Sequence, residues 1–334
     1  MWTNYTEIPE DAFTGVTFSN IYIQACNECN KFKVTIHPKA FGKTRPFVQS
    51  LIFSTNVDSK SDEFRDTFVA VNSLVNVRHI AINAGFEALT AHTFRSIVSS
   101  GPGGQTRLKT VTIRGKSLKR IESYAFYAVP NLDFIDLSDN RIEIIERHAF
   151  AFRQKGSKPL LIDLRSNNLN SQSFERGALS HILRPVELVL FSNKMMCSKG
   201  FQYLDEDIFA PFFACDTRNM IQLGPCPLYC DCNMKWLVEA PKHWRLQIRG
   251  GDQRVSHLQC INENSLFEKK IEDFGNCDSD CDQNVLQMNV HKSVVCKRNQ
   301  LVNENLIPNY WTIFWWKYFK YLFISFLYLF SVII

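Results

Sequence analysis

The sequence lacks two features that would indicate an enzyme or a nucleic-acid-binding protein: catalytic motifs and a strong excess of basic residues. Its 334 residues include 38 Lys and Arg and 33 Asp and Glu, which gives a net charge of only +5. Domains that bind nucleic acids usually carry a dense basic stripe. No HExxH, GxSxG, Walker or dinucleotide-binding motif occurs in the chain. We therefore expect no catalysis, no cofactor and no nucleic-acid partner.

The cysteines lack the spacing of zinc sites, although they are numerous. Cys230 and Cys232 have no second Cys-x-x-Cys and no histidine pair nearby, which argues against a bound metal. Clustered cysteines of this kind are typical of a disulfide-stabilised module made in an oxidising compartment. Because the total is odd, at least one thiol is free or pairs with another chain. Seven of the 11 cysteines lie in the last third of the chain: Cys226, Cys230, Cys232, Cys260, Cys277, Cys281 and Cys296.

The N-terminus lacks the basic stretch and apolar run of a secretory signal peptide. Either the protein is cytosolic or its true start lies upstream. Residues 8–13 read as the end of a repeat whose strand would precede them, so we expect an upstream start with a signal peptide. The predicted location is then extracellular or at the cell surface. Asn4, in Asn4-Tyr5-Thr6, is the one N-glycosylation acceptor, and it would be used only in a secreted protein.

A strand motif with the pattern L-x-x-L-x-L-x-x-N recurs along most of the chain. Its clearest copy is Leu132-x-x-Ile135-x-Leu137-x-x-Asn140, and seven further copies are found by aligning this template. This is the leucine-rich-repeat pattern. It predicts an α/β repeat solenoid, a leucine-rich-repeat arc with a parallel concave sheet of about eight strands. The eight motifs are centred on Ile21/Ile23, Leu51/Phe53, Ile80/Ile82, Val111/Ile113, Ile135/Leu137, Ile162/Leu164, Leu188/Leu190 and Ile221/Leu223.

Two further positions recur in these repeats. The asparagine that ends each motif is expected to bond backbone groups where the chain leaves the sheet; Cys26, Gly85, Lys116 and Cys226 occupy this position in the other four repeats. The asparagines are Asn56, Asn140, Asn167 and Asn193. A phenylalanine follows most strands and predicts a stacked row in the core: Phe41, Phe94, Phe126, Phe150 and Phe209.

Residues that alternate with the buried ones point away from the core and define the outer face of the predicted sheet. Solenoids of this kind use that face for binding. Asp136 and Asp163 occupy equivalent positions in adjacent strands, about 5 Å apart by strand spacing. Such a pair could do acid–base work, mark a binding face or form ordinary solvated contacts. We predict a protein-binding patch of mixed charge and aromatics: Phe134, Asp136, Asp163, Arg165, Glu187 and Phe191.

The chain after the last strand motif is expected to cover the open end of the solenoid with a small helix that carries Trp236. The segment from Pro227 to Leu237 resembles the cysteine-rich C-terminal flanking module of extracellular leucine-rich-repeat proteins. This resemblance implies the disulfides Cys230–Cys260 and Cys232–Cys277. The partners of the other cysteines stay open: Cys26, Cys29, Cys197, Cys215, Cys226, Cys281 and Cys296.

Residues 8–277 also resemble a group of arthropod leucine-rich-repeat proteins that are described as similar to the non-catalytic subunit of Oplophorus-luciferin 2-monooxygenase. The resemblance rests on residues 137–142, 162–169, 204–212 and 227–232. The stretch Leu204-Asp205-Glu206-x-x-Phe209-Ala210-Pro211 is its most specific part, because it is not part of the general repeat. Cys226 departs from the group, which typically has Asn there. The resemblance implies association with a catalytic partner, without catalysis by this chain.

The last 24 residues, 311–334, are almost entirely aromatic and aliphatic apart from Lys317 and Lys320. They are long enough to cross a bilayer or to signal a glycolipid anchor, and they also read as translated non-coding sequence. The predicted organisation is a solenoid at 1–224, incomplete at its N-terminus, a cysteine-rich cap at 225–281, a linker at 282–310 and this tail. We expect a protein partner, with a membrane contact possible through 311–334. The alternatives are an accessory subunit of an enzyme and a membrane-anchored adhesion or receptor ectodomain.

Overall fold

The computed structural model divides the chain into two compact units, Met1–Cys296 and Lys297–Ile334. All of the residues that it describes belong to the first unit. They are residues 7–15, 17–24, 35–42, 47–58, 69–71, 73–85, 87–94, 107–156, 158–193, 204–223, 228–229, 235–249, 259–262 and 265–270.

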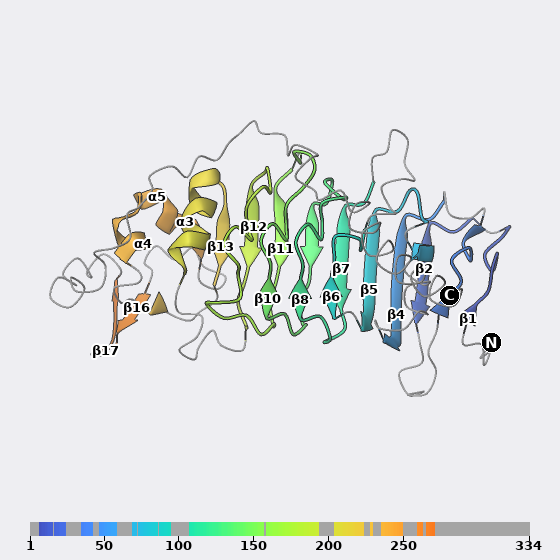
Figure 1. Ribbon diagram of the computed structural model, residues 1–334, viewed down its shortest axis with the longest axis horizontal. Helices are drawn as coiled ribbons and strands as arrows, with labels where there is room; N and C mark the ends of the chain where they lie inside the picture. The colour runs from blue at the N-terminus through green and yellow to red at the C-terminus, as the bar shows by residue number, and fades with distance from the viewer. Residues whose placement is uncertain are drawn as a thin grey trace, which may run out of the picture. The chain divides into compact units, whose positions relative to one another are not determined.

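The main element of the fold is a sheet of nine parallel strands that lie in chain order (Figure 1). Eight of its strands are the eight that the repeat motif predicts, and the ninth, β15, comes from the predicted cap and pairs with β13. The fold is therefore a leucine-rich-repeat solenoid. In order, the strands are β2 (Asn20–Gln24), β4 (Ser50–Asp58), β5 (His79–Gly85), β7 (Thr110–Arg114), β9 (Phe134–Asp136), β11 (Leu160–Asp163), β12 (Val186–Val189), β13 (Met220–Gln222) and β15 (Ile248–Arg249).

The register of the sheet places the motif's aliphatic residues in one buried row. Ile80 pairs with Val111, which pairs with Ile135, and the row continues through Ile162 and Leu188. All five side chains are at most 1% exposed. Fully burying one such side chain stabilises a fold by about 1.5–3 kcal/mol, so the repeats stabilise each other by stacking.

The phenylalanines that follow the strands pack in the same core, as predicted. Phe94 stacks on Phe126 with ring centroids 5.5 Å apart, and Phe126 stacks on Phe150 at 5.7 Å. Phe41 forms a similar pair with Phe13 at 5.4 Å. Phe209 is buried but differs in geometry, since it meets Phe174 edge-on at 5.7 Å. Its repeat carries a helix at this position, which changes the direction of its ring.

Short strands run on the other side of the repeats, between the Asn turn and the phenylalanine. β6 (Ala88–Leu89), β8 (Arg120–Ile121) and β10 (Ile144–Ile145) form one small parallel sheet. A second small sheet joins β1 (Glu7–Ile8) to β3 (Thr35–Ile36). The strands β3, β6, β8 and β10 each contribute one buried aliphatic residue, Ile36, Leu89, Ile121 and Ile145, and Ile8 of β1 is partly buried against the same core.

The repeat before β13 contains the helix α3 (Glu206–Cys215) instead of a short strand. Asp205 caps the helix by accepting a hydrogen bond from the Asp207 backbone N–H at 2.8 Å, and Phe212 and Phe213 bury its inner side. The stretch from 204 to 212, which carried the family resemblance, is therefore a capped helix.

The chain after β13 closes the end of the core with α4 (Lys235–Glu239) and α5 (Lys242–Leu246). Trp236 lies in α4, as predicted, and its Nε1–H donates to the Leu204 carbonyl at 3.1 Å. The ring of Trp244 in α5 packs against that of Phe213 in α3, with centroids 6.0 Å apart. These aromatic contacts continue the core beyond the last leucine-rich repeat.

A small sheet made of β14 (Leu228–Tyr229), β16 (Gln259–Asn262) and β17 (Ser265–Lys270) follows. Cys260 lies in β16 opposite Leu228. Its predicted partner Cys230, and the predicted pair Cys232 and Cys277, lie outside the described residues, so both disulfides stay predictions. Cys215, whose pairing the sequence left open, is disulfide-bonded.

The predicted linker, the hydrophobic tail at 311–334 and the glycosylation site at Asn4 also lie outside the described residues. Within the described part of the chain, no helix has the length and apolar character needed to cross a bilayer.

Candidate functional site

The outer face of the nine-stranded sheet carries most of the residues that the sequence predicted to bind. Strand register places Asp136 beside Asp163, as expected from their equivalent positions. The same row continues on one side to Thr112 and on the other to Val189 and Gln222. The neighbouring outward row contains Phe134, Leu161 and Glu187. Sequence alternation therefore brings the predicted patch together on the central strands.

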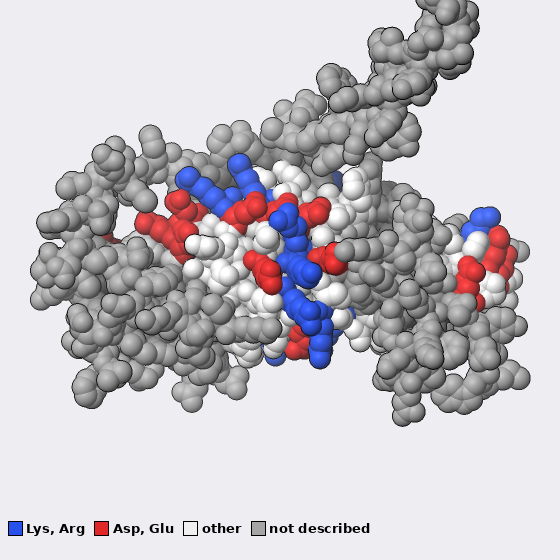
Figure 2. Space-filling view, turned by 60° about the horizontal axis from the view of Figure 1, so that its bottom comes forward, with Lys and Arg blue, Asp and Glu red and all other residues white. Residues whose placement is uncertain are grey.

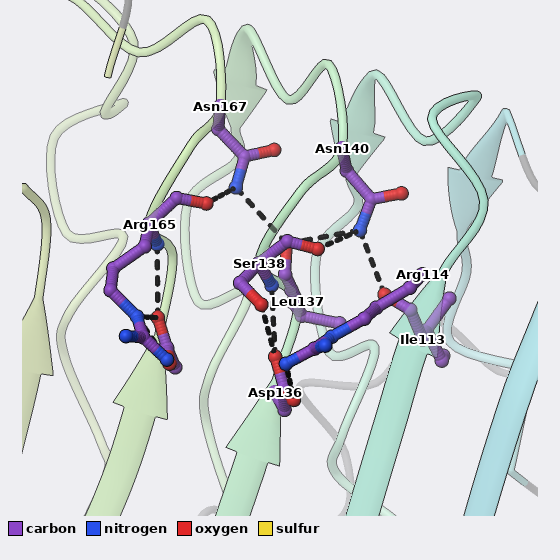
Figure 3. Close-up of polar contacts among 9 residues, drawn as sticks. Ile113, Arg114, Asp136, Leu137, Ser138, Asn140, Arg165 and Asn167 are labelled. Carbon is purple, nitrogen blue, oxygen red and sulfur yellow. Dashed lines mark hydrogen bonds and ion pairs between the residues drawn. The ribbon is translucent and has the colours of Figure 1, made fainter. Parts of the chain in front are cut away.

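Asp136 is held by three hydrogen bonds and is only 4% exposed. Its Oδ2 accepts from Arg114 at 2.7 Å, while its Oδ1 accepts from the hydroxyl of Ser138 at 2.7 Å and from the Ser138 backbone N–H at 3.1 Å (Figure 3). Arg114 comes from the preceding strand, and about half of its side chain stays exposed. The bonds to Arg114 and Ser138 therefore occupy both oxygens of the Asp136 carboxylate. The guanidinium of Arg114 is the group at this position that a partner can reach.

Asp163 repeats this arrangement with an arginine of its own repeat. Its two oxygens accept from Nε of Arg165 at 2.9 and 2.8 Å, and the carboxylate is 3% exposed. The guanidinium of Arg165 also lies over the ring of Phe191, 5.2 Å from its centroid. The hydrogen bond that Arg165 donates to Asp163 is the main cause that raises the pKa of Arg165. Arg165 is therefore a fixed positive charge at the surface, clamped between a carboxylate and an aromatic ring.

These contacts bear on the acid–base alternative for Asp136 and Asp163. A pair of carboxylates that shares a proton needs its oxygens to face each other. Here each carboxylate instead faces its own arginine, and neither is exposed enough to reach a substrate. The geometry therefore favours two separate ion pairs that pre-organise Arg114 and Arg165.

Glu187 lies at the C-terminal side of this cluster. It accepts a hydrogen bond from the side chain of Gln222 and lies 3.9 Å from Arg249 of β15. Phe134 and Phe191 are both half-buried. All six predicted binding residues are thus on or directly after strands β9, β11 and β12, although only Arg165, Glu187 and the two rings present surface to solvent.

Asn140 and Asn167 fix the ends of the strands that present this cluster (Figure 3). The side-chain amide of Asn167 donates to the carbonyls of Leu137, Leu164 and Arg165 at 2.9–3.0 Å, and its Oδ1 accepts from the Ile142 N–H at 3.0 Å. Asn140 makes the equivalent donations, to Ile113 among others. This confirms the predicted role of the asparagines. The side-chain surroundings of Asn56 lie outside the described residues.

The turn after β7 explains one irregularity in this asparagine ladder. Asp139 and Ser166, each directly before a ladder asparagine, adopt a positive φ, but in the earlier repeat Lys116 itself has φ of 60°. The Oδ1 of Asn140, which faces this turn in the repeat order, is buried without a hydrogen-bond donor. Lys116 occupies the motif position that Asn140 and Asn167 hold in the next two repeats, and the bond that Asn167 Oδ1 accepts from the preceding turn has no counterpart at Asn140.

Sequence reasoning gave no special weight to the exposed apolar residues at the N-terminal end of the outer face. Tyr22 of β2 and Ile52 of β4 are register partners, and they are 61% and 38% exposed. Both lie at outward motif positions, where a solvated strand would carry polar residues. That apolar character at outward positions is the signal that could have identified them.

Ion pairs between strands mix both signs of charge on the outer face, such as Arg114–Asp136 at 2.7 Å and Arg249–Glu187 at 3.9 Å. Charges of both signs also occur elsewhere on the solenoid. Figure 2, which brings the lower side of Figure 1 forward, shows Lys and Arg side chains in a column, with Asp and Glu side chains on both sides. Several are ion pairs between successive repeats, such as Arg120–Glu146 at 3.0 Å. Among the described residues no group of three or more His, Cys, Asp or Glu is placed to hold a metal ion.

His148 packs between repeats and contacts their side chains. Its Nδ1 lies 2.7 Å from the hydroxyl of Ser180, and its ring stacks on Tyr124 with centroids 5.4 Å apart. Burial, together with the neighbouring His181 and Arg147, lowers the pKa of His148 to about 4. The side chain is therefore neutral at physiological pH and serves as packing between repeats.

One family model supports the repeat pattern in the central part of the chain. The family model described as "Leucine rich repeat" matches residues 106–153, which span β7 to β10. A chain in a solved octameric complex of Latrophilin 3, Unc5D and FLRT2 (LRR) is similar at 13% identity, with a TM-score of 0.34, over 69% of this chain and 75% of that chain. No relative was found among curated proteins.

Proposed function

We propose that this protein is an extracellular or cell-surface binding module that engages a partner protein through the outer, concave face of its sheet. The observation that carries the proposal is the pair of pre-organised arginines on that face. Arg165 is fixed by Asp163 and Phe191, and Arg114 is fixed by Asp136. A side chain that is already ordered loses less entropy on binding, and arginines and aromatics dominate protein interfaces.

The exposed apolar pair Tyr22 and Ile52 gives the same face a second contact region. Together, the two regions offer apolar area on β2 and β4 and directional hydrogen-bond donors on the central strands. Parallel solenoids use an extended face of this kind to bind a large partner. The mixed charge of the surroundings favours a folded protein over a polyanion as the partner of this face, because neither sign dominates it.

The location is supported by the disulfide at Cys215, since disulfides persist mainly in oxidising compartments. Peptide mapping of the secreted protein under non-reducing conditions tests this part. We expect peptides that join Cys230 to Cys260 and Cys232 to Cys277. Free thiols at all four positions in secreted protein would contradict the proposed cap.

The binding face is tested by cross-linking the full chain to proteins on intact cells and quantifying the captured partner by mass spectrometry. Two outer-face variants are compared with the wild type: Tyr22→Ser with Ile52→Ser, and Asp163→Asn with Arg165→Gln. The second pair removes both charges together, so that no buried carboxylate is left unpaired. We expect each variant to capture the partner at least about tenfold less well, as hot-spot losses of more than 1.4 kcal/mol imply.

A control variant, Lys39→Ser with Arg176→Ser, changes two exposed side chains that lie outside the sheet, with exposed fractions of 73% and 81%. It is expected to capture the partner as the wild type does. Equal capture by the outer-face variants and the control would overturn the proposed binding face.

A further inference from the structure

The most unusual polar group among the described residues is a buried arginine without a hydrogen-bond acceptor. Arg184 lies just before β12 and is 7% exposed. All three of its guanidinium nitrogens are buried, and none has a hydrogen-bond partner. Most buried polar groups in proteins are hydrogen-bonded, and a buried charge without a partner is strongly destabilising. An arginine that is kept in this state calls for a physical explanation.

The segment between Phe152 and Gly156 encloses this guanidinium. The ring of Phe152 lies under it, with the guanidinium carbon 4.7 Å from the ring centroid. Gly156 closes the other side, where a Cβ atom would overlap the guanidinium. The cation–π contact stabilises the charge, but it uses the face of the guanidinium. The N–H groups in its plane remain free to bind an acceptor.

The chain that encloses Arg184 is rich in basic residues. Arg153 follows Phe152 and has a buried Nε without a hydrogen-bond partner. Lys155 and Lys158 are exposed on the same segment. Asp133 is the one acidic residue that acts on the pKa of Arg184, and its carboxylate lies 3.8 Å from Lys109. Burial lowers the pKa of Arg184 to about 10, so the side chain remains protonated at neutral pH.

The enclosing segment is weakly attached to the rest of the fold. Among the described residues, its backbone hydrogen bonds are confined to its first two positions: the Phe152 N–H donates to the His181 carbonyl at 3.1 Å, and the Arg153 N–H donates to the Tyr127 carbonyl at 3.3 Å. Few hydrogen bonds and exposed side chains are features of segments that open locally. Opening of residues 153–156 would expose the donors of Arg184 without disturbing the sheet.

We propose that Arg184, together with Arg153 and the lysines at 155 and 158, forms a binding site for a sulfate or phosphate group. The guanidinium presents a planar set of donors, which matches the oxygens of a tetrahedral oxyanion. The exposed lysines near the enclosing segment add positive charge, so the group can be a free ion or a substituent on a sugar chain. This site is separate from the outer face of the sheet, and it does not depend on the protein-binding proposal.

The site is tested by thermal unfolding of the full chain in increasing sulfate, with chloride used to keep the ionic strength constant. Sulfate stabilises most proteins by exclusion from their surface, and that effect grows linearly. We expect an additional, saturating rise in Tm for the wild type that is missing in Arg184→Met. Replacing a buried charge by an apolar side chain of similar size is often neutral or stabilising, so this variant is expected to fold. Arg176→Met removes an exposed charge and should keep the saturating rise.

A second variant, Gly156→Ala, tests the same site by changing the residue that encloses the guanidinium. Gly156→Ala places a methyl group where the guanidinium lies, so it should displace Arg184 and raise the half-saturating sulfate concentration at least tenfold. Calorimetry with inorganic sulfate, inorganic phosphate and a heparin oligosaccharide then separates the sources of the group. Loss of heparin binding alone in Lys155→Ala with Lys158→Ala would indicate a sugar-borne sulfate. A saturating rise of equal size in the wild type, Arg184→Met and Gly156→Ala would overturn the site.

Discussion

Single residues in this solenoid matter most where one side chain serves two repeats. Asn167 is the clearest case, because its amide bonds carbonyls on both sides of the gap between repeats and its carbonyl accepts from the earlier turn. The side-chain amide N–H groups of Asn140 make equivalent bonds, but no N–H group donates to its side-chain oxygen. The two asparagines therefore occupy the same motif position with different numbers of bonds.

We predict that Asn167→Ala lowers the free energy of unfolding by about 3 kcal/mol, and that Asn140→Ala lowers it by about 1 kcal/mol less. The removed side chain leaves several buried backbone groups unpaired, at roughly 1–3 kcal/mol for each buried group. Denaturant unfolding measures the difference. Asn168→Ala is the control, since the amide of Asn168 bonds Glu143 at the surface. A loss in Asn140→Ala as large as that in Asn167→Ala would contradict the weaker ladder at Lys116.

His148 makes stability depend on pH. Its pKa is about 4 in the folded protein, against an ordinary value of 6.5, so below pH 6.5 the unfolded chain binds the proton first. The stabilisation is complete above pH 6.5 and is lost as the pH falls towards 4. After allowance for partial exposure of the ring, we predict that the free energy of unfolding falls by about 2 kcal/mol between pH 6.5 and pH 4.

The His148 prediction is measured by unfolding at pH 7 and pH 4.5. His148→Asn retains a residue that tolerates the positive φ of 61° at this position, and it should show a smaller change between the two pH values than the wild type. His79→Asn, on the exposed outer face, serves as the control. An unchanged pH dependence in His148→Asn would show that His148 is not responsible.

At the scale of elements, the end of the solenoid is closed by short helices and aromatic contacts. The side chain of Trp236 in α4 reaches back to Leu204, before α3, while Trp244 in α5 contacts Phe213. β15 then adds a strand to the main sheet. The terminal apolar surface of a repeat stack has to be covered for solubility, and here helices and a strand share that role.

We predict that Trp236→Ala lowers the free energy of unfolding by about 3 kcal/mol, as truncations of large aromatic side chains in cores do. Trp236→Phe keeps the ring packing and loses the N–H donor to Leu204, so it should cost about 1 kcal/mol. Leu246→Ala, in α5 and 71% exposed, is the matched control and should leave stability unchanged. Thermal unfolding followed by circular dichroism distinguishes the three variants. Equal stability of Trp236→Ala and Leu246→Ala would mean that α4 does not cover the core.

At the scale of the whole solenoid, most contacts join a repeat to its immediate neighbours. The row Phe94, Phe126 and Phe150 shows this directly, since each ring stacks on the next. In such a quasi-linear stack, stability is approximately a sum of repeats and their interfaces. Damage to one repeat should therefore spread outward from it.

We predict that Phe126→Ala lowers the free energy of unfolding by about 3–5 kcal/mol and that its effect is graded along the sheet. Native-state hydrogen exchange should show the greatest loss of protection in β7 and β9, and a smaller loss in β2 and β13. Val69→Ala, at a site that is 46% exposed, is the control and should change neither the free energy of unfolding nor the protection of the strands. A uniform loss of protection over all described strands would indicate one cooperative unit instead.

The leucine-rich strand motif by itself determined the eight strands, their parallel order and their buried rows. The reason is local: alternate side chains of a strand face opposite sides, and a fixed motif must place the same residue types on the same side in each repeat. The same alternation placed Asp136 beside Asp163 and assigned the asparagines their role at the strand ends. The phenylalanine row followed for the same reason.

Only the tertiary structure decided what these residues do with their neighbours. The sequence marks Asp136 and Asp163 as outward, but their burial depends on Arg114 and Arg165 folding over them. The ninth strand, β15, has no motif, because it pairs by proximity to β13. Arg184 reads as an ordinary loop residue in the sequence. Its burial between Phe152 and Gly156 depends on contacts between segments nearly 30 residues apart, and no local pattern specifies such contacts.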